Sequence, residues 1–445
     1  MKKKFFALCI AGTNSGCGKT TITTALIWAL KKRGLNVAPF KCGPDYIDPS
    51  YHSAASGNPS INLDSWIMSD KVIKESFLRN SSNSDIAVVE GVMGLFDGAS
   101  SSQTGSTAEC AIILNLPVIL IVNASGLGAS IAPLVYGFTK FNPQVKIRGV
   151  IANKIGSKKH RKICEESLKK NSLPPLLGAF PNNYKFHIPE RHLGLLPWIE
   201  NKNKDFFFEG LAEDIEKNLD IDTIINLSEF TQTNSLKQPI YPPPKYLAAI
   251  AKDEAFNFYY HDNIHFLRMS GFKIVEISPI RDKKLPEKLD LLYLGGGFPE
   301  IFAKELSENC EFRKSVASFA KSGGKIYAEC GGFMYLSTEL QNSEGKIFPM
   351  CNVIPGKTQM TKKCKALGYR EVKTLHQLPF CKKNTIIRGH EFHWSEFLAN
   401  NKMNFLFECK DSNGNTWQDG VKINNVFASY IHLHFLSITP ENSKI

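Results

Sequence analysis

The chain has 445 residues, of which 43% are hydrophobic and 22% are charged. At about 100–200 residues per domain, this length predicts two or three domains, and the composition excludes an intrinsically disordered chain. The formal net charge of +12 would suit nucleic-acid binding, but the sequence has no dense basic block with interleaved aromatic residues. We therefore expect no nucleic-acid partner, and a polyanionic small-molecule substrate fits the charge equally well.

The first residues, Lys2 to Ile10, resemble a signal peptide. The apolar run is short and leads directly into a glycine-rich loop without a cleavage site, so we interpret it as a buried strand. No uninterrupted apolar stretch reaches about 18 residues, which predicts no membrane-spanning helix. The 11 cysteines include no Cys-x-x-Cys pair. This argues against a disulfide framework or a zinc module and predicts a reducing, cytoplasmic location.

Short apolar runs alternate with amphipathic stretches in the first half of the chain. We expect a helix over residues 20–33, ended by Gly34. Strands that alternate with helices predict an α/β domain with a parallel sheet covered on both faces. The expected strands are residues 5–10, 37–40, 86–89, 118–122 and 149–151.

Residues 236–245 include three consecutive prolines, which favour a stiff, extended linker. We therefore predict a first domain over residues 1–235 and a second over residues 246–445. The α/β pattern restarts after the linker, so the second domain is also expected to be α/β. Its predicted strands are residues 246–251, 273–277, 289–294 and 325–329.

A glycine-rich loop separates the first predicted strand from the first helix. Backbone N–H groups and a helix N-terminus would form a positive nest for phosphate there. Lys19 would reach the β- and γ-phosphates, and the Thr20 hydroxyl would hold Mg²⁺. The alternative is a glycine-rich turn with a surface lysine. The predicted ATP-binding residues are Gly12, Gly16, Cys17, Gly18, Lys19 and Thr20.

The spacing of this loop departs from the strict P-loop pattern, which requires glycine where Thr13 stands. With its glycine at Gly12, the loop resembles the dethiobiotin synthetase branch of P-loop enzymes. Partition-type ATPases carry lysine at the position of Asn14, so that branch is disfavoured.

Acidic residues follow two of the predicted strands. Asp45 and Asp48 come after the second strand, and Glu90 and Asp97 come after the strand at residues 86–89. Ligands of open α/β sheets bind at the carboxyl ends of strands, where carboxylates can meet Mg²⁺ and phosphate. Each aspartate alone could be a turn former. We predict Thr20, Asp45 and Glu90 as Mg²⁺ ligands, with Asp48 and Asp97 at the ATP and acceptor site.

Cys330 follows a predicted strand in the second half and precedes two glycines. A nucleophile on a sharp strand-to-helix turn needs small neighbours, and the N-terminus of a helix, predicted over residues 334–340, would lower the thiol pKa. The alternative is a buried structural thiol, which is how we interpret the other cysteines.

His432 lies near the end of the chain and could serve Cys330 as a base if folding brings them together. Backbone N–H groups of Gly296, Gly297 and Gly331 could form an oxyanion hole. For His390, His393 and His434 we favour surface or hydrogen-bonded core positions. His432 and His434 could also form a metal pair, but no third ligand is evident.

Several longer motifs are distributed along the whole chain. They are Gly43-Pro44-Asp45-Tyr46-Ile47-Asp48, Asn62-Leu63-Asp64, Arg191-His192-Leu193-Gly194-Leu195, Asp253-Glu254-Ala255-Phe256-Asn257-Phe258-Tyr259-Tyr260, residues 295–300, Glu329-Cys330-Gly331-Gly332, Arg388-Gly389-His390-Glu391-Phe392-His393 and Tyr430-Ile431-His432-Leu433-His434. Through these motifs both halves resemble known families of cobalamin biosynthesis. The second half is similar to class I glutamine amidotransferase domains, and the first half looks like the cobyrinate a,c-diamide synthase family rather than the cobyric acid synthases. The likeness spans essentially the whole chain.

The chain departs from the usual amidotransferase pattern at two positions. Ala328 replaces the first glycine of the Gly-x-Cys-x-Gly turn, and His434 stands where a glutamate usually follows the catalytic histidine. The resemblance therefore implies a Cys330–His432 dyad without the orienting carboxylate.

The resemblance implies an ATP- and glutamine-dependent amidation of the a and c acetate carboxylates of cobyrinate, through an acyl phosphate. Its implied partners are a tetrapyrrole polycarboxylate, L-glutamine and ATP with Mg²⁺, and a homodimer is compatible with the sequence. Hydrogenobyrinate or nickel-sirohydrochlorin are alternative acceptors. A P-loop switch protein with an inert amidotransferase domain is an alternative of another class, which the presence of both Cys330 and His432 disfavours.

Overall fold

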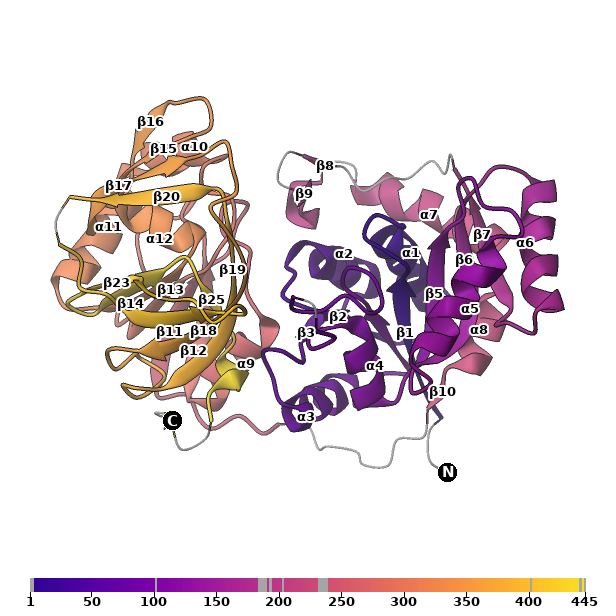
Figure 1. Cartoon of the computed structure of the whole chain (residues 1–445). Coiled ribbons are helices and arrows are strands. Elements are labelled where there is room, and N and C mark those ends of the chain that lie inside the picture. Colours follow the sequence, from indigo (N-terminus) through magenta and orange to yellow (C-terminus); the bar gives the residue numbers. More distant parts are fainter. Residues whose placement is uncertain are drawn as a thin grey trace. The chain divides into compact units, whose positions relative to one another are not determined.

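The computed structural model describes residues 4–100, 102–182, 190–191, 194–201, 204–230, 239–400, 402–439 and 442–443. The chain divides into two compact units, Met1–Pro239 and Ile240–Ile445, each with its own sheet and its own hydrophobic core (Figure 1). Residues 239–245, the described part of the predicted linker, form neither helix nor strand, and Ile240 is 90% exposed.

A parallel sheet forms the centre of the first unit, with the strand order β3-β2-β4-β1-β5-β6-β7. All neighbours along this order pair in parallel, and β10 pairs with β1 as an antiparallel strand. The predicted parallel sheet is therefore confirmed. The strands are β1 (Phe5–Gly12), β2 (Val37–Cys42), β3 (Ile61–Leu63), β4 (Ile86–Glu90), β5 (Pro117–Asn123), β6 (Lys146–Ile155), β7 (Leu176–Pro181) and β10 (Glu229–Phe230).

The helices of the first unit connect these strands. Helix α1 begins directly after Gly18, which has φ +97°, and Gly34 follows its end with φ +84°, so glycines without a Cβ form both junctions. The helices are α1 (Lys19–Lys32), α2 (Ile47–Ser56), α3 (Asp70–Ser81), α4 (Thr107–Leu114), α5 (Ile131–Phe141), α6 (Lys158–Lys170), α7 (Lys204–Asn218), α8 (Ile221–Leu227) and the 3₁₀ turn η1 (Trp198–Glu200). A separate hairpin pairs β8 (Glu190–Arg191) with β9 (Gly194–Leu195).

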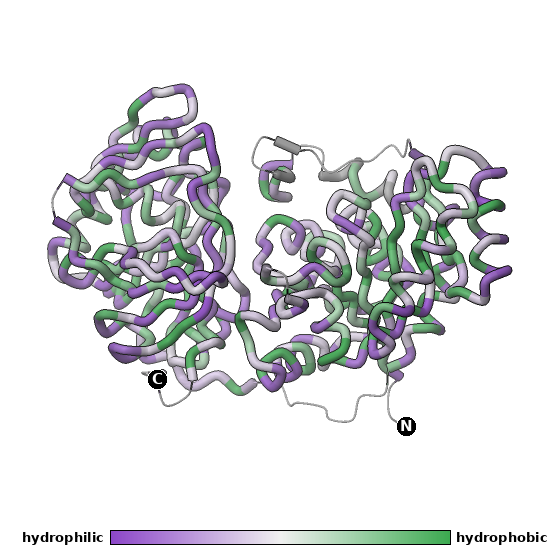
Figure 2. Tube along the Cα trace, viewed as in Figure 1, coloured by the Kyte–Doolittle hydropathy of each residue, from purple (hydrophilic) through white to green (hydrophobic). Residues whose placement is uncertain are grey.

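The core of the first unit lies between the central strands and the helices that cover them. Every residue of β2 and β4 is buried, as expected for strands covered on both faces. In Figure 2 the central strands are green, whereas the outer turns of α6 are largely purple. This burial leaves the carboxyl ends of β1, β2 and β4 as the places where polar side chains collect.

A six-stranded sheet of order β12-β11-β13-β14-β24-β23 forms the centre of the second unit. Its first five strands are parallel and β23 is antiparallel. The predicted second α/β domain is confirmed. The strands are β11 (Tyr246–Ala251), β12 (Phe272–Ile277), β13 (Leu291–Leu294), β14 (Lys325–Glu329), β23 (Val421–Ile423) and β24 (Val426–Ser429).

Two further sheets, of orders β16-β15-β17-β20 and β22-β21-β18-β19-β25, complete the second unit. Their strands are β15 (Ser337–Gln341), β16 (Ile347–Pro349), β17 (Ile354–Met360), β18 (Ala366–Thr374), β19 (Ile386–His393), β20 (Ser395–Ala399), β21 (Phe407–Asp411), β22 (Thr416–Asp419) and β25 (His432–Leu433). The helices are α9 (His261–Met269), α10 (Ala303–Glu308), α11 (Cys310–Lys321), α12 (Gly331–Leu336) and the 3₁₀ turn η2 (Phe435–Ser437).

The bounds predicted for the helix after Cys330, residues 334–340, are wrong, because only residues 334–336 of this range are helical. Helix α12 begins immediately after Cys330 and ends at Leu336, and Ser337 is extended with ψ 171°. From there the chain pairs with β16 and β17 as strand β15. Strand pairing with distant segments therefore overrides the local helical pattern.

None of the helices in the described ranges combines the length and the apolar character that a bilayer crossing requires.

Candidate functional site

The phosphate loop lies at the carboxyl end of β1, whose neighbours are β4 and β5. The Leu95 N–H, from the segment that follows β4, donates to the carbonyl oxygen of Gly12 at 2.8 Å. The Asn153 amide of β6 donates to the carbonyl oxygen of Cys17 at 2.9 Å. These two contacts hold the loop from segments that belong to strands on either side of β1 in the sheet.

Steric constraints explain why glycine occupies positions 12, 16 and 18 of this loop. A Cβ on Gly12 would lie 2.4 Å from Cys17 Sγ and 3.0 Å from Lys19 Cδ. Gly16 and Gly18 have φ angles of +75° and +97°, a region that residues with a Cβ rarely adopt. The Lys19 side chain lies back over the loop and donates to the carbonyl oxygen of Asn14 at 3.3 Å. The loop therefore has the close-packed form that a phosphate nest requires.

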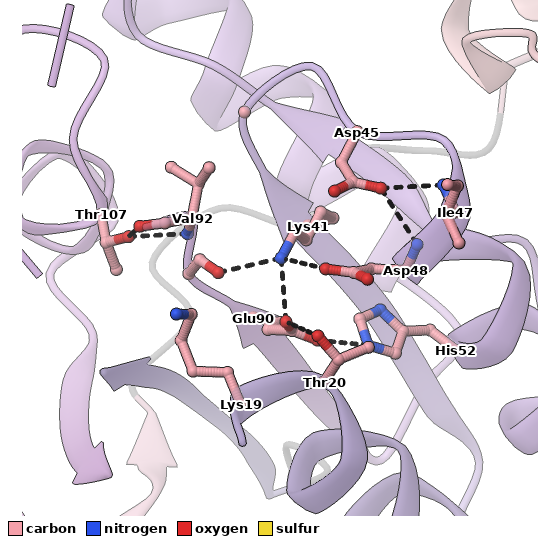
Figure 3. A network of polar contacts seen from close by, with 12 residues as sticks. Lys19, Thr20, Lys41, Asp45, Ile47, Asp48, His52, Glu90, Val92 and Thr107 are labelled. Carbon is pink, nitrogen blue, oxygen red and sulfur yellow. Dashed lines mark hydrogen bonds and ion pairs between the residues drawn. The ribbon is translucent and has the colours of Figure 1, made fainter. Parts of the chain in front are cut away.

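Glu90, at the end of β4, is fully buried and lies beside the first turn of α1. Its Oε1 accepts a hydrogen bond from the Thr20 hydroxyl at 3.0 Å and forms an ion pair with Lys41 Nζ at 2.8 Å (Figure 3). Its Oε2 lies 2.5 Å from His52 Nε2. The predicted Mg²⁺ ligands Thr20 and Glu90 are thus brought together.

Lys41, at the end of β2, is the centre of this network. Its ammonium contacts Asp48 Oδ2 at 2.6 Å as well as Glu90, and it donates to the carbonyl oxygen of Gly91 at 3.0 Å (Figure 3). Both side chains of the Lys41–Asp48 pair are nearly inaccessible. A cation between two buried carboxylates offsets the repulsion that would otherwise separate them.

Burial and charge shift these groups in different directions. Burial alone would lower the pKa of Lys41, but Asp48, Glu90 and Asp45 raise it above its usual value. Burial and the nearby Asp45 raise the pKa of Asp48 to about 8. Burial would also raise the pKa of Glu90, but Lys41 and His52 hold it below its usual value. Both carboxylates contact the lysine, and Asp48 binds a proton more readily than Glu90 does.

Asp45 and Asp97 both stabilise local backbone. Asp45 Oδ1 accepts the N–H groups of Ile47 and Asp48 at 2.8 and 3.0 Å, at the start of α2 (Figure 3). Asp97 Oδ2 accepts the Gly94 N–H at 2.8 Å. One carboxylate oxygen of each residue therefore has the turn-forming role that was the alternative interpretation.

No group of three His, Cys, Asp or Glu side chains is arranged to hold a metal within the ranges that the structure describes. Mg²⁺ commonly binds one or two carboxylates together with substrate phosphates, rather than a closed protein cage. The oxygens of Thr20 and Glu90, 3.0 Å apart, suit that kind of site.

Sequence reasoning missed Lys41 and His52 as members of this site. Lys41 stands in a strand whose six residues are all buried, and a lysine is almost never fully buried unless it is paired. The position of Lys41 within an apolar strand was therefore the sequence feature that could have identified it as a site residue. His52 lies one helical turn after Asp48 on α2, and only the fold shows that it faces Glu90.

Cys330 forms the junction between β14 and α12 in the second unit. It has φ +45° and ψ −102°, a conformation that a residue with a Cβ rarely adopts, and it is buried. Its N–H donates to the carbonyl oxygen of Ser429 at 2.8 Å. A strained, strand-to-helix cysteine matches the predicted nucleophile geometry.

The pKa of the Cys330 thiol is raised above its usual value, mainly by burial and then by Glu300, while the Gly331 N–H opposes this shift. The N–H at the start of the helix thus acts in the predicted direction, but burial outweighs it and the pKa is raised overall. Helix α12 is a short six-residue helix, and its one favourable N–H does not outweigh desolvation. The thiol needs a base to become a nucleophile.

The predicted oxyanion-hole glycines lie next to Cys330 and His432. A Cβ on Gly331 would lie 3.1 Å from the Gly297 nitrogen, so the backbones of these two glycines approach closely. A Cβ on Gly296 would lie 2.3 Å from Cε1 of His432. Gly296 must therefore be glycine to admit the imidazole.

The predicted base, His432, is buried at the start of β25. Its Nδ1 lies 3.7 Å from Oε2 of Glu329, the residue that precedes Cys330. Sequence reasoning gave Glu329 no role. Its position next to the cysteine was visible, but the proximity to His432 comes from the fold.

The other histidines occupy the core or its edge. The His434 ring packs at a tilt against Tyr260, with ring centroids 4.7 Å apart and an interplanar angle of 47°. Burial lowers the pKa of His390 to about 3. His393 stacks on Tyr430 at 3.8 Å and contacts Glu391 at 2.9 Å. The preferred core interpretation agrees with these contacts.

A pocket of about 210 Å³ lies near this site, and Tyr430 and Glu391 line it. Glu391 is close enough to Cys330 to raise the pKa of the thiol, after burial and Glu300. The remaining lining residues are Phe333, Lys365, His393, Ser395, Glu396, Phe397, Met403, Trp417, Asp419, Gly420 and Val421.

Residues 8–195 match the family described as the CobQ/CobB/MinD/ParA nucleotide binding domain. Residues 248–440 match the CobB/CobQ-like glutamine amidotransferase domain. A nucleotide-binding domain joined to a glutamine amidotransferase domain defines a glutamine-dependent amidoligase.

Curated relatives narrow this class. The chain is 40% identical to a cobyrinate a,c-diamide synthase of Priestia megaterium, over 97% of this chain and 94% of the relative. It is 41% identical to one of Syntrophotalea carbinolica, over 97% and 95%, and 40% identical to one of Listeria innocua, over 96% and 95%. The chain belongs to the cobyrinate a,c-diamide synthase family.

Proposed function

We propose that the protein converts the a and c acetate carboxylates of cobyrinate into amides, with ATP as energy source and glutamine as ammonia donor, in cobalamin biosynthesis. One observation carries the proposal, namely the similarity to synthases of this name over 97% of the chain. The presence of a phosphate loop and a strained cysteine within the two matched regions agrees with it.

In the first unit, Lys19 and the loop from Gly12 to Thr20 bind the phosphates of ATP. An oxygen of the substrate carboxylate attacks the γ-phosphorus, ADP leaves, and an acyl phosphate forms. Ammonia then attacks the carbonyl carbon and inorganic phosphate leaves, which produces the amide. Lys41 lies beside Asp48 and Glu90, where its charge can stabilise the transferred phosphoryl group.

Mg²⁺, when bound, neutralises charge on the phosphates. Thr20 and Glu90 offer it hard oxygen ligands 3.0 Å apart, and Asp45 and Asp48 lie on the adjoining segment. Asp97 stands in the loop that follows β4, beside the phosphate loop, and we propose it for the ATP and acceptor site.

In the second unit, Cys330 attacks the side-chain amide carbon of glutamine while His432 takes the thiol proton. His432 returns the proton to the leaving nitrogen, so ammonia departs and a glutamyl thioester remains, which water hydrolyses. The N–H groups of Gly297 and Gly331, with Gly296 packed against the base, support the developing oxyanion.

Incubation of the purified protein with cobyrinic acid, ATP, Mg²⁺ and glutamine tests the proposal by mass spectrometry. We expect two successive carboxylate-to-amide mass changes, each dependent on ATP. Glutamine hydrolysis without any change of cobyrinic acid would contradict the assignment of the acceptor, but it would still support amidotransferase activity. Hydrogenobyrinate and nickel-sirohydrochlorin are then the next acceptors to assay.

A further inference from the structure

We infer that Glu329 is the positioning carboxylate of the base His432, an inference that rests on the glutamine chemistry proposed for the second unit. The carboxylate comes from the strand of the nucleophile, immediately before Cys330, and not from the segment of the histidine. Its Oε2 lies 3.7 Å from His432 Nδ1, and both side chains are almost fully buried.

Three donors fix the Glu329 carboxylate. The Tyr327 hydroxyl donates to Oε1 at 2.8 Å, and the Tyr293 hydroxyl donates to Oε2 at 3.0 Å. The Leu433 N–H donates to Oε1 at 3.1 Å. The last bond ties the carboxylate to the backbone of the residue after His432, so Glu329 fixes the base through the main chain as well as through its charge.

The topology explains how this residue reaches the base. Strands β14 and β24 are parallel neighbours, with Glu329 opposite Ser429, and both end at the same edge of the sheet. His432 follows β24 after a short connection. The position two residues after His432 carries His434, whose ring packs at a tilt against Tyr260 instead of supplying a carboxylate.

The chemical role of Glu329 follows from charge. When Cys330 transfers its proton to His432, an imidazolium forms in a buried site, where a nearby carboxylate stabilises it strongly. At 3.7 Å the contact exceeds a hydrogen bond, so the effect is electrostatic and weaker than that of a directly bonded carboxylate. The titratable groups that the described contacts place beside this imidazole are Glu329 from β14 and His390, which lies opposite His432 on β19.

The test compares Glu329→Gln with Glu329→Asp in the full chain, by the pH profile of glutamine hydrolysis. Glu329→Gln removes the charge and keeps an acceptor, so we expect kcat to fall about 10- to 100-fold with KM for glutamine nearly unchanged. The acid limb should move to lower pH by about one unit, because the imidazolium loses its counter-charge. Glu329→Asp keeps the charge and should keep the limb near its original pH.

Tyr293→Phe supplies a second measurement that does not depend on the folding of Glu329→Gln. It removes a donor from Oε2, the oxygen nearest His432, and leaves the negative charge in place. The free oxygen can interact more strongly with the imidazolium, so the acid limb should move to higher pH, opposite to Glu329→Gln.

Asp253→Asn is the matched control, because Asp253 is a buried carboxylate that accepts from Ser278 and the Ile280 N–H. It should lower thermal stability without moving the acid limb. If the acid limb of the pH profile lies at the same pH in Glu329→Gln, Glu329→Asp and the unaltered protein, the inference is overturned. Glutamine hydrolysis by the unaltered protein is measured first, to establish that the second unit is active. If the unaltered protein does not hydrolyse glutamine, the proposed function is refuted instead. In every active variant, synthesis from ammonium should persist.

Discussion

At the scale of single residues, the first unit depends on the charge of Lys41. This lysine separates two buried carboxylates and carries the only positive charge that an ion-pair distance assigns to Asp48 among the described residues. Its removal leaves Asp48 and Glu90 buried and adjacent to each other, and an unpaired buried charge is strongly destabilising.

Lys41→Ala should lower the free energy of unfolding of the first unit by about 3–5 kcal/mol. Hydrogen exchange of peptides from residues 4–182, in increasing urea, measures this loss. Lys71→Ala is the control, because its 4.0 Å pair with Glu75 is exposed and should contribute less than about 1 kcal/mol. Equal losses in the two variants would contradict the role given to the buried network.

Cys330→Ala tests the division of chemistry between the two units. It should abolish amide synthesis from glutamine and leave synthesis from ammonium intact, because only the release of ammonia needs the thiolate. Mass spectrometry of the acceptor measures both reactions. Cys310→Ala, at an exposed cysteine of the same unit, should retain both. A folded Cys330→Ala protein that loses both reactions equally would refute the assigned roles.

At the scale of elements, the turn between β1 and α1 depends on the packing of Gly12 against Cys17. Gly12→Ala places a Cβ 2.4 Å from Cys17 Sγ, so the loop must shift away from its phosphate-binding form. We expect the Kd for ATP to rise by at least about tenfold, which corresponds to about 1.4 kcal/mol. Titration with a fluorescent ATP analogue measures the change.

The double variant Gly12→Ala/Cys17→Ala removes the clashing sulfur and should recover part of the affinity. Gly137→Ala on α5 is the control, since nothing lies within 4 Å of its Cβ position. If the double variant binds ATP no better than Gly12→Ala, steric contact with Cys17 is not the cause.

At the scale of the whole molecule, two compact units in one chain predict two unfolding transitions. The units Met1–Pro239 and Ile240–Ile445 have separate hydrophobic clusters. A ligand that binds one folded unit stabilises that unit by about 2.7 kcal/mol at a concentration of 100 times its Kd. In calorimetry, Mg²⁺–ATP should raise one transition temperature and leave the other unchanged. A single transition that shifts as a whole would show that the units unfold together.

Several elements of the fold were predictable because their signals are local. The strand over residues 325–329 and the helix after the phosphate loop follow from apolar runs and from flanking glycines. The helix predicted over residues 334–340 failed because the chain after Leu336 pairs with β16 and β17, which local periodicity does not report. Tertiary pairing overrides propensity in such segments.

The sequence by itself determined the phosphate loop, the strand-to-helix cysteine and the two α/β patterns, because backbone sterics and hydrophobic period act between residues close in the chain. Only the tertiary structure decided that Lys41 and His52 meet Glu90, and that Glu329 lies 3.7 Å from His432. Those contacts join residues on different strands and helices. Their charges act through space at the shared edge of a sheet, where chain position says little about distance.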